Sequence, residues 1–290
     1  MNELIAPSWS EYELIDCGNF EKLERFGPYI LIRPEPQAMW DRKLTEKEWL
    51  DMAHARYEAK TSNSGDWQQI KKIFTPWKIE FEGDGFSLKF KLNFTAFKHI
   101  GIFPEQSANW NYLYKFLKNS GIAQPKVLNL FAYTGGASLA AKKAGADVIH
   151  LDSIKQVVNW SRENMELSGL KDIRWVVEDA LKFAIRESRR GNKYHAIIMD
   201  PPSYGLGPAG ERWKLEDHLN DMVKHVISLL DPDKHCFIIN TYSMNLSSLV
   251  LKNLVESNIK VKNPDYGELC LKSKQGIVLP LGSYYRFVKI

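Results

Sequence analysis

The stretch Val127–Ala141 most constrains the fold of this 290-residue chain. An apolar run, Val127–Phe131, is followed by Ala132-Tyr133-Thr134-Gly135-Gly136 and then by an alanine-rich segment. A short apolar run stopped by paired glycines predicts a buried strand, a tight turn and a helix. Gly135 and Gly136 either only reverse the chain or also let a ligand approach the backbone closely, and these residues alone leave both interpretations open.

After this turn, apolar runs of strand length alternate with longer runs that suit helices. Pro201-Pro202 stops the fourth run, because proline cannot donate to a strand ladder. Such alternation predicts an α/β fold, a doubly wound Rossmann-like sheet with helices on both faces. A last strand is expected at 284–290, with its direction left open. The predicted strands are 127–131, 147–152, 173–178, 194–200 and 235–241, and the predicted helices are 109–119, 154–168, a segment ending near 190, 215–230 and 247–257.

Residues 1–95 have a different character, and we expect them to form a small N-terminal β-rich (α+β) domain before a second domain over 96–290. Between Trp77 and Leu92, apolar and polar residues alternate on both sides of Gly83-Asp84-Gly85. This pattern predicts a β-hairpin with one buried and one exposed face. Leu44–Lys60 is predicted to be a helix.

The N-terminal region is rich in tryptophan. Exposed aromatic rings can stack on unpaired bases, at roughly 1–3 kcal/mol per base, so these rings could form a platform for RNA. Large rings also fill the cores of small β-rich domains, which is the interpretation we favour. Five of the nine tryptophans lie here: Trp9, Trp40, Trp49, Trp67 and Trp77.

Charge and cysteine content exclude some classes of protein. The 39 basic and 35 acidic residues leave a net charge of +4, which permits nucleic-acid binding without indicating it. Cys17, Cys236 and Cys270 are few and far apart, so neither a disulfide framework nor a metal site is expected. Without a secretory leader or an apolar run approaching ~18 residues, we expect a cytoplasmic protein that does not span a membrane.

Four predicted strands end in groups that suit a ligand, and ligands of open α/β sheets bind at the carboxyl ends of the strands. Asp152 lies where a carboxylate can bind ribose hydroxyls, the role we favour over capping the next helix. The G-x-G-x-x-G fingerprint of dinucleotide enzymes is missing, so a nucleoside without a pyrophosphate, such as S-adenosylmethionine, fits better. The strand ends are Tyr133-Thr134-Gly135-Gly136, Asp152-Ser153, Asp179-Ala180 and Asp200-Pro201-Pro202-Ser203-Tyr204.

Three segments resemble class I S-adenosylmethionine-dependent methyltransferases: Asn129–Gly136, Leu151-Asp152-Ser153 and Asp200–Tyr204. More narrowly, they are similar to the bacterial family that includes the large-subunit rRNA cytosine-C5 and guanine-N7 methyltransferases. The likeness covers roughly residues 94–243. In the similar lead-in segment Lys98–Gln106, Gln106 matches the family pattern, and the next residue, Ser107, stands in place of its arginine.

The resemblance implies S-adenosylmethionine as cofactor and a role for each matching residue. Phe131, Tyr133 and Gly135 would line the methionine end of the cofactor, Asp152 would hold its ribose, and Asp179 would reach its adenine amine. Asp200 would face the methyl-transfer site, where the Pro201 carbonyl and Tyr204 help to orient the acceptor. Gln106, Thr134, Ser153 and Ala180 complete the expected cofactor-binding set. No metal is expected.

The resemblance implies RNA, specifically rRNA, as the substrate, and we expect the methylated atom to be a base nitrogen, with an oxygen as the weaker alternative. Cytosine C5 needs a cysteine that adds to the ring, and the family carries it just after the fifth strand. Here that segment is Thr241-Tyr242-Ser243, and Cys236 lies about five residues, or roughly 16 Å, from the reaction edge. Two alternatives remain: methylation of a small molecule or a protein by the same fold, or an RNA-binding protein that keeps the cofactor pocket without activity. The sequence leaves the oligomeric state open.

Overall fold

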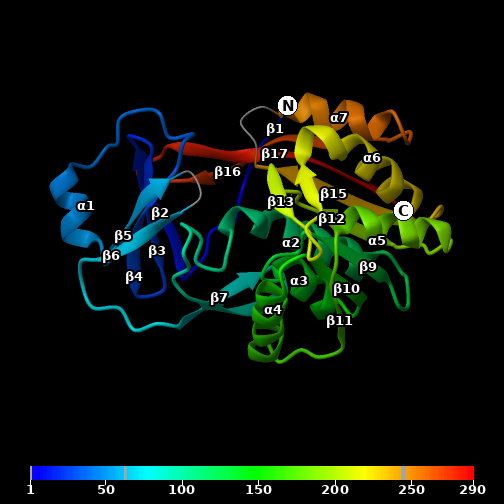
Figure 1. Cartoon of the computed structure of the whole chain (residues 1–290), viewed down its shortest axis with the longest axis horizontal. Coiled ribbons are helices and arrows are strands. Elements are labelled where there is room, and N and C mark those ends of the chain that lie inside the picture. The colour runs from blue at the N-terminus through cyan, green and yellow to red at the C-terminus, as the bar shows by residue number, and fades with distance from the viewer. Residues whose placement is uncertain (1, 62–63, 243–245) are drawn as a thin grey trace.

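The computed structural model describes residues 2–61, 64–242 and 246–290 (Figure 1). Its centre is an eight-stranded sheet in the order β1-β16-β17-β15-β12-β9-β10-β11. Strand β17 (Val278–Lys289) runs antiparallel to both of its neighbours, and β1 (Asn2–Ile5) is parallel to β16 (Asp265–Lys272). The parallel strands are β9 (Lys126–Leu130), β10 (Asp147–Asp152), β11 (Ile173–Val177), β12 (Ala196–Met199) and β15 (His235–Thr241).

Helices cover both faces of this sheet, which confirms the predicted α/β, Rossmann-like fold. Neighbouring residues on β9 point to opposite faces: Val127 packs with Trp110 and Leu139, and Leu128 packs with Phe183 and Val226. One face carries α2 (Ser107–Asn119), α3 (Gly136–Lys143) and α4 (Lys155–Leu167), and the other carries α5 (Ala180–Arg189), α6 (Leu215–Ser228) and α7 (Ser248–Glu256). Among the described residues, no helix is long and apolar enough to cross a membrane.

The N-terminal region forms a separate five-stranded sheet in the order β2-β3-β4-β5-β6. In Figure 1 this sheet and α1 (Glu46–Met52) lie at the opposite side of the molecule from α5. The turn between β16 and β17 reaches it, since the Lys274 amide donates to the Leu14 carbonyl. The strands are β2 (Tyr12–Gly18), β3 (Glu21–Phe26), β4 (Tyr29–Pro34), β5 (Ala55–Thr61) and β6 (Ser64–Gln69).

The helix predicted over Leu44–Lys60 is wrong in its second half. A capping box between Thr45 and Glu48 starts α1, but the helix ends at Met52 and the chain continues as β5. In that segment Ala55 and Tyr57 are buried, and Glu58 is exposed, the two-residue period of a strand. Pairing with β4 and β6 therefore outweighs the helical preference of these residues.

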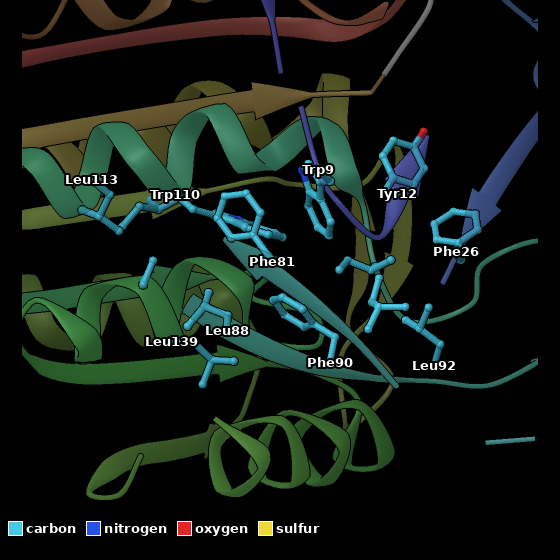
Figure 2. Close-up of a cluster of buried hydrophobic side chains, with 14 of the residues drawn as sticks. Trp9, Tyr12, Phe26, Phe81, Leu88, Phe90, Leu92, Trp110, Leu113 and Leu139 are labelled. Carbon is cyan, nitrogen blue, oxygen red and sulfur yellow. The ribbon is translucent and has the colours of Figure 1, made fainter. Parts of the chain in front are cut away.

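The predicted hairpin is confirmed as β7 (Trp77–Gly83) and β8 (Phe86–Leu92), with Trp77 opposite Leu92. Side chains of α4 satisfy the backbone of β8, because Asn164 accepts from the Lys91 amide and Ser168 accepts from the Lys89 amide. Figure 2 shows that this hairpin, the N-terminal sheet and the helices of the central sheet contribute to one cluster. Its labelled side chains are Trp9, Tyr12, Phe26, Phe81, Leu88, Phe90, Leu92, Trp110, Leu113 and Leu139.

The five N-terminal tryptophans belong to the core, as predicted. Trp9, Trp49 and Trp77 are buried, and Trp40 and Trp67 pack against the same cluster as Trp9 and Trp77. Each indole N–H also donates within the chain, for example from Trp49 to the buried Asp16 carboxylate and from Trp9 to Ser107. These rings are therefore committed to packing rather than to stacking on bases.

Candidate active site

The turn after β9 is held in a backbone conformation that few residues adopt. Phe131 and Tyr133 have φ values of 55° and 49°, and Gly135 has φ 95°. A left-handed φ costs a residue with a Cβ roughly 1–2 kcal/mol, and such strain clusters at functional sites. Glycine is required at position 136 for a steric reason, because a Cβ there would lie 2.3 Å from the Trp110 ring. Both glycines are thus required by the fold, and Phe131 and Tyr133 are the stronger functional indicators.

Polar side chains from α4 donate hydrogen bonds to the backbone carbonyls of this turn. Ser161 Oγ donates to the Tyr133 carbonyl at 2.6 Å, and Asn164 Nδ2 donates to the Thr134 carbonyl at 3.0 Å. Thr134, itself buried, donates to the Gly101 carbonyl at 2.7 Å. The strained backbone is therefore fixed by several hydrogen bonds and is formed before any ligand binds.

A buried histidine, His150 on β10, completes this support. Its Nδ1 lies 3.0 Å from Ser138 Oγ, and its Nε2 lies 3.3 Å from Ser161 Oγ. Burial, helped by Arg162, lowers the pKa of His150 to about 3. The imidazole is consequently neutral at physiological pH and serves the turn as a structural bridge. Sequence patterns did not single out His150, Ser161 or Asn164.

Asp152, at the end of β10, contacts the turn directly. Its Oδ2 accepts from the Tyr133 amide at 2.9 Å, and its Oδ1 accepts from the Ile154 amide at 3.0 Å. Burial raises the pKa of Asp152, although the amides of Ile154, Tyr133 and Ser153 counteract it. Asp152 does not cap α4, whose N-cap is Ile154. A carboxylate offers about four acceptor positions, so the bonds from the Tyr133 and Ile154 amides leave capacity for two ribose hydroxyls.

Asp179 and Ala180 follow the next strand of the sheet. Asp179 is the N-cap of α5, and its Oδ1 accepts from the Lys182 amide at 2.8 Å. Val177 is the register partner of Asp152, so Asp179 lies two residues beyond the level of that carboxylate. The second Asp179 oxygen has acceptor capacity for a ligand amine, and the buried Ala180 begins the helix.

Gln106 joins the lead-in segment to Asp200, at the end of β12. Its Nε2 donates to Asp200 Oδ2 at 2.8 Å. Its Oε1 accepts from both Asn109 and Asn240, each at 3.1 Å. Asn109 Oδ1 accepts in turn from Arg286 Nη1 at 3.1 Å. These side chains form a continuous polar relay from β17 through α2 and β15 to the end of β12.

The chemistry of Arg286 fixes the direction of every bond in this relay. A guanidinium can only donate, so the Asn109 oxygen must face it and the Asn109 amide group must face Gln106. The Gln106 oxygen is then the acceptor, and its amide group must point at Asp200. Asp265 anchors the far end with a 2.8 Å bond from Arg286 Nε. Asp200 therefore has one oxygen fixed as an acceptor, and its other oxygen can serve a substrate.

Asp200 also has an unusual acidity. Burial, reinforced by the nearby Glu105 carboxyl, raises the pKa of Asp200 from 3.8 to about 7. Burial likewise raises the pKa of Glu105. A carboxyl that exchanges its proton near neutral pH suits a group that accepts a hydrogen bond or a proton from an acceptor.

Residues 201–214, which follow Asp200 and are called the flap here, contact the turn after β9. Pro201 is buried, and Tyr204 begins the short hairpin of β13 (Tyr204–Leu206) and β14 (Arg212–Lys214), with its ring 60% exposed. Trp213 Nε1 donates to the Pro202 carbonyl at 2.6 Å, and its ring packs 5.0 Å from that of Phe131. Trp213 was not predicted from the sequence, and it joins the flap to the strained turn.

The three thiols of the chain are all buried. Cys236 lies at the amino end of β15, opposite Ala196 and Val288, and the strand continues for five residues to Thr241. Burial raises the pKa of Cys17 and Cys270 to about 12 and raises that of Cys236 as well. The Thr241-Tyr242-Ser243 segment of the sequence analysis is described only through Tyr242, because Ser243 lies outside the described residues.

The residues gathered at this edge have the chemistry that S-adenosylmethionine requires. Carboxylates with remaining acceptor capacity lie at the end of β10 and just after β11 and β12, and the strained turn lies where β9 ends between β10 and β12. Carboxylates suit ribose hydroxyls, an adenine amine and a sulfonium cation. Within 2–61, 64–242 and 246–290, no cluster of three or more histidine, cysteine, aspartate or glutamate residues is placed to hold a metal ion.

Known proteins with the same features are S-adenosylmethionine-dependent methyltransferases. Residues 50–240 match the sequence profile of the Methyltrans_SAM family, described by that activity. The crystal structure of the SAM-dependent methyltransferase from Agrobacterium tumefaciens is 35% identical, with a TM-score of 0.88 over 99% of this chain and 96% of that one. A putative methyltransferase, SMU.776, crystallised with S-adenosylhomocysteine, shares the fold at 17% identity, with a TM-score of 0.73 over 98% of this chain and 76% of that one.

Curated relatives of this chain include proteins named as ribosomal RNA methyltransferases. The ribosomal RNA large subunit methyltransferase K/L of Shewanella frigidimarina is 30% identical over 198 residues, which is 67% of this chain and 26% of that protein. The corresponding protein of Shewanella sp. strain ANA-3 is 31% identical over 195 residues, which is 65% of this chain and 26% of that protein. The chain thus spans about a quarter of the length of these relatives.

Proposed function

Because this chain belongs to the S-adenosylmethionine-dependent methyltransferase family, we propose that it transfers a methyl group to a nitrogen of an RNA base, in ribosomal RNA. The similarity to proteins named as ribosomal RNA methyltransferases supports RNA as the acceptor. The observation that favours a nitrogen acceptor is Asp200, a carboxyl of raised pKa that Gln106 fixes at the carboxyl edge of the sheet.

S-adenosylmethionine supplies an electrophilic methyl group on a sulfonium, which reacts in line with a nucleophile. In this proposal Asp152 binds the ribose and Asp179 the adenine amine. Gln106, Phe131, Tyr133, Thr134, Gly135, Ser153 and Ala180 complete the cofactor site. Asp200 Oδ1, the Pro201 carbonyl and Tyr204 orient an amine or ring nitrogen of the acceptor. As the new N–C bond forms and the sulfur–methyl bond breaks to leave S-adenosylhomocysteine, the proton on that nitrogen would pass to the Asp200 carboxylate or to water.

The cysteines support a nitrogen acceptor over cytosine C5. Methylation of C5 requires a thiolate that adds to the ring, and the thiolate is the reactive form of cysteine. All three thiols of the chain are buried with raised pKa values. The cysteine on β15, Cys236, is the second residue of the strand, five residues before its carboxyl end. A base nitrogen needs no such covalent step.

We further propose that residues 1–95 recognise the RNA and residues 96–290 carry out catalysis, in the cytoplasm. Tyr242, which follows β15, donates to Glu35, which follows β4. The N-terminal region therefore contributes a residue beside the segment that follows β15. This contact supports a role of residues 1–95 on the acceptor side of the site.

The test is transfer of a labelled methyl group from S-adenosylmethionine to RNA, protein and metabolite pools from cells that lack this protein. Digestion of the labelled RNA to nucleosides and mass spectrometry then identify the product. We expect label in ribosomal RNA as an N-methylated nucleoside. Label in 5-methylcytosine would reject the nitrogen, and label only in protein or metabolites would reject RNA. RNA binding without transfer to any pool would identify a protein that keeps the pocket without activity.

A further inference from the structure

Tyr242 and Asp200 follow neighbouring strands at the carboxyl edge of the central sheet. Strands β15 and β12 are parallel neighbours, with Ile239 opposite Met199, so the residues that follow them leave the sheet side by side. Ser203 Oγ donates to the Tyr242 carbonyl at 3.4 Å. The main chain of Tyr242 is thereby tied to the segment that begins with Asp200.

The relay that fixes Asp200 also includes the strand that leads to Tyr242. Asn240, two residues before it, donates to Gln106, which donates to Asp200. The Glu105 carboxyl raises the pKa of both Asp200 and Tyr242, so both groups lie within its electrostatic range. Tyr242 and Asp200 thus follow neighbouring strands, are linked through Ser203 in the segment after Asp200, and lie within range of the same carboxyl.

The side chain of Tyr242 is held by residues outside the central sheet. Its hydroxyl donates to Glu35 Oε1 at 2.5 Å, and Glu35 is buried and paired with Lys22 at 3.3 Å. Lys98 Nζ lies 5.5 Å from the centre of the ring. Burial, together with Glu35, raises the pKa of Tyr242, so the hydroxyl stays protonated and is occupied as a donor. It is therefore not available to act as a base or a nucleophile.

Although both ends of this residue are fixed, 41% of it is exposed. Trp49 and Tyr284, whose side chains also bond to distant residues, are fully buried by comparison. Tyr242 instead remains partly accessible, although its hydroxyl and its main chain are held at the edge where β12 and β15 end. An aromatic surface that is ordered in advance binds a planar ligand without a further entropic cost for its own side chain.

We propose that the Tyr242 ring is one wall of the acceptor site, on which an unpaired nucleobase of the RNA stacks while Asp200 faces its nitrogen. Glu35 is a positioning residue in this arrangement, because it orients the ring through the hydroxyl. The inference rests on the proposed function, since it names the part of the RNA that enters the site. It also gives residues 1–95 a specific task at the reaction centre.

The experiment compares the full-length Tyr242→Leu variant with the wild type in methyl transfer to unmodified ribosomal RNA. Stacking of one base is worth ~1–3 kcal/mol, so we expect KM for RNA to rise about ten- to a hundredfold. Tyr242→Phe keeps the ring and loses only the bond to Glu35, so its KM should rise less, about two- to fivefold. Ile290→Ala, a change of an exposed apolar residue at the opposite edge of the central sheet, next to Lys289 that pairs with the amino end of β15, should leave KM unchanged.

Calorimetric titration with S-adenosylhomocysteine separates this role from a structural one, because a folded variant with an intact cofactor site keeps the wild-type Kd. If Tyr242→Leu fails to bind, Tyr242→Met provides a second aliphatic side chain for the same comparison. A KM for RNA equal to that of the wild type in either folded variant would show that no base stacks on the Tyr242 ring. The proposed methylation of RNA would not be contradicted by that result. A wild type that transfers no methyl group to RNA overturns the proposed function and this inference together.

Discussion

Glu24 in the N-terminal sheet and Asp200 at the edge of the central sheet are both poorly exposed carboxyls, but they have opposite surroundings. Glu24 Oε2 accepts from Arg33 Nε at 2.8 Å and Nη2 at 2.7 Å, and its Oε1 accepts from the Tyr12 hydroxyl at 2.9 Å. Burial raises the pKa of Glu24, but Arg33 and Lys22 more than offset this and hold it below its usual value.

Among the described residues, the side chain bonded directly to Asp200 is the neutral amide of Gln106, and the Arg286 cation lies at the far end of the relay. Burial and Glu105 together raise the pKa of Asp200 to about 7. The comparison teaches that burial alone does not decide what a carboxyl does. A cation of matched geometry makes Glu24 a permanent charge and a structural element, whereas an amide partner leaves Asp200 able to exchange a proton near neutral pH.

The largest effect is expected from breaking the Glu24 pair. Arg33→Met removes the cation but leaves the buried carboxyl, so the free energy of unfolding should fall by about 3–5 kcal/mol. Urea unfolding followed by tryptophan fluorescence measures this change. The double variant Arg33→Met with Glu24→Leu removes both charges and should recover most of the loss. A single-variant cost of only a few tenths of a kcal/mol would show that Glu24 does not depend on its cation.

Asp200 differs from Glu24 because its pKa is raised in the folded protein, so its ionisation lowers the free energy of unfolding. Between about pH 4 and pH 7 the folded protein keeps a proton on Asp200 that the unfolded chain has lost, so this carboxyl makes stability fall as the pH rises. Asp200→Asn removes the effect. It should match the wild type near pH 4 and be more stable by about 2–4 kcal/mol at pH 8. Urea unfolding at several pH values measures the difference.

The activity of the same variant sharpens the comparison. Asp200→Asn should lose methyl transfer at every pH, and wild-type kcat should rise as the pH passes through about 7, where the carboxylate forms. The control is Asp217→Asn, an exposed carboxylate on α6. An Asp200→Asn variant that gains no stability at pH 8 and keeps full activity would show that Asp200, like Glu24, has only a structural role.

Asp152 tests whether a carboxyl bonded only to backbone amides still binds a ligand. Asp152→Ala should lose charge-assisted hydrogen bonds worth ~1.5–3 kcal/mol, and the Kd for S-adenosylmethionine should rise about ten- to a hundredfold by calorimetry. Asp147→Ala, at the exposed beginning of the same strand, is the matched control. An unchanged affinity in the folded Asp152 variant would reject the ribose role and leave this carboxyl as support for the turn.

Sequence reasoning reached the parts of this molecule that depend on local patterns. The strands β10 and β15 begin and end at the predicted residues, and the carboxyl ends of parallel strands necessarily bring Asp152, Asp179 and Asp200 to one edge. Gln106 was found through its resemblance to a family pattern. The hairpin of β7 and β8 followed from its two-residue alternation and its glycine turn.

The parts that sequence reasoning missed depend on contacts between distant residues. Asn240 and Arg286 lie 131 and 177 residues from Asn109, so no local pattern connects the members of the relay. Strand β1 pairs with β16 near the other end of the chain, and β5 is a strand only because β4 and β6 flank it. Cys236 could be excluded from the reaction because strand geometry alone gave its distance from the edge.

The smallest effect, and the one most specific to the relay, is expected at Asn109. Asn109→Asp is isosteric, but it offers Gln106 an acceptor in place of a donor, so the Gln106 amide must turn and present its oxygen to Asp200. The Asp200 carboxylate would then lose a donor and face a second oxygen. Asn109→Ala only removes the constraint. Each change should lower kcat by about three- to tenfold, equivalent to roughly 1 kcal/mol.

The sign of the pH shift distinguishes this relay from general loosening of the fold. Both variants should move the midpoint of the kcat profile above that of the wild type, with Asn109→Asp moving it further, and both should keep the wild-type Kd for S-adenosylhomocysteine. Asn119→Asp adds the same charge at the exposed end of α2 and should leave the profile in place. A midpoint that stays fixed while kcat falls would mean that Asn109 supports the packing of α2 and does not orient Gln106 toward Asp200.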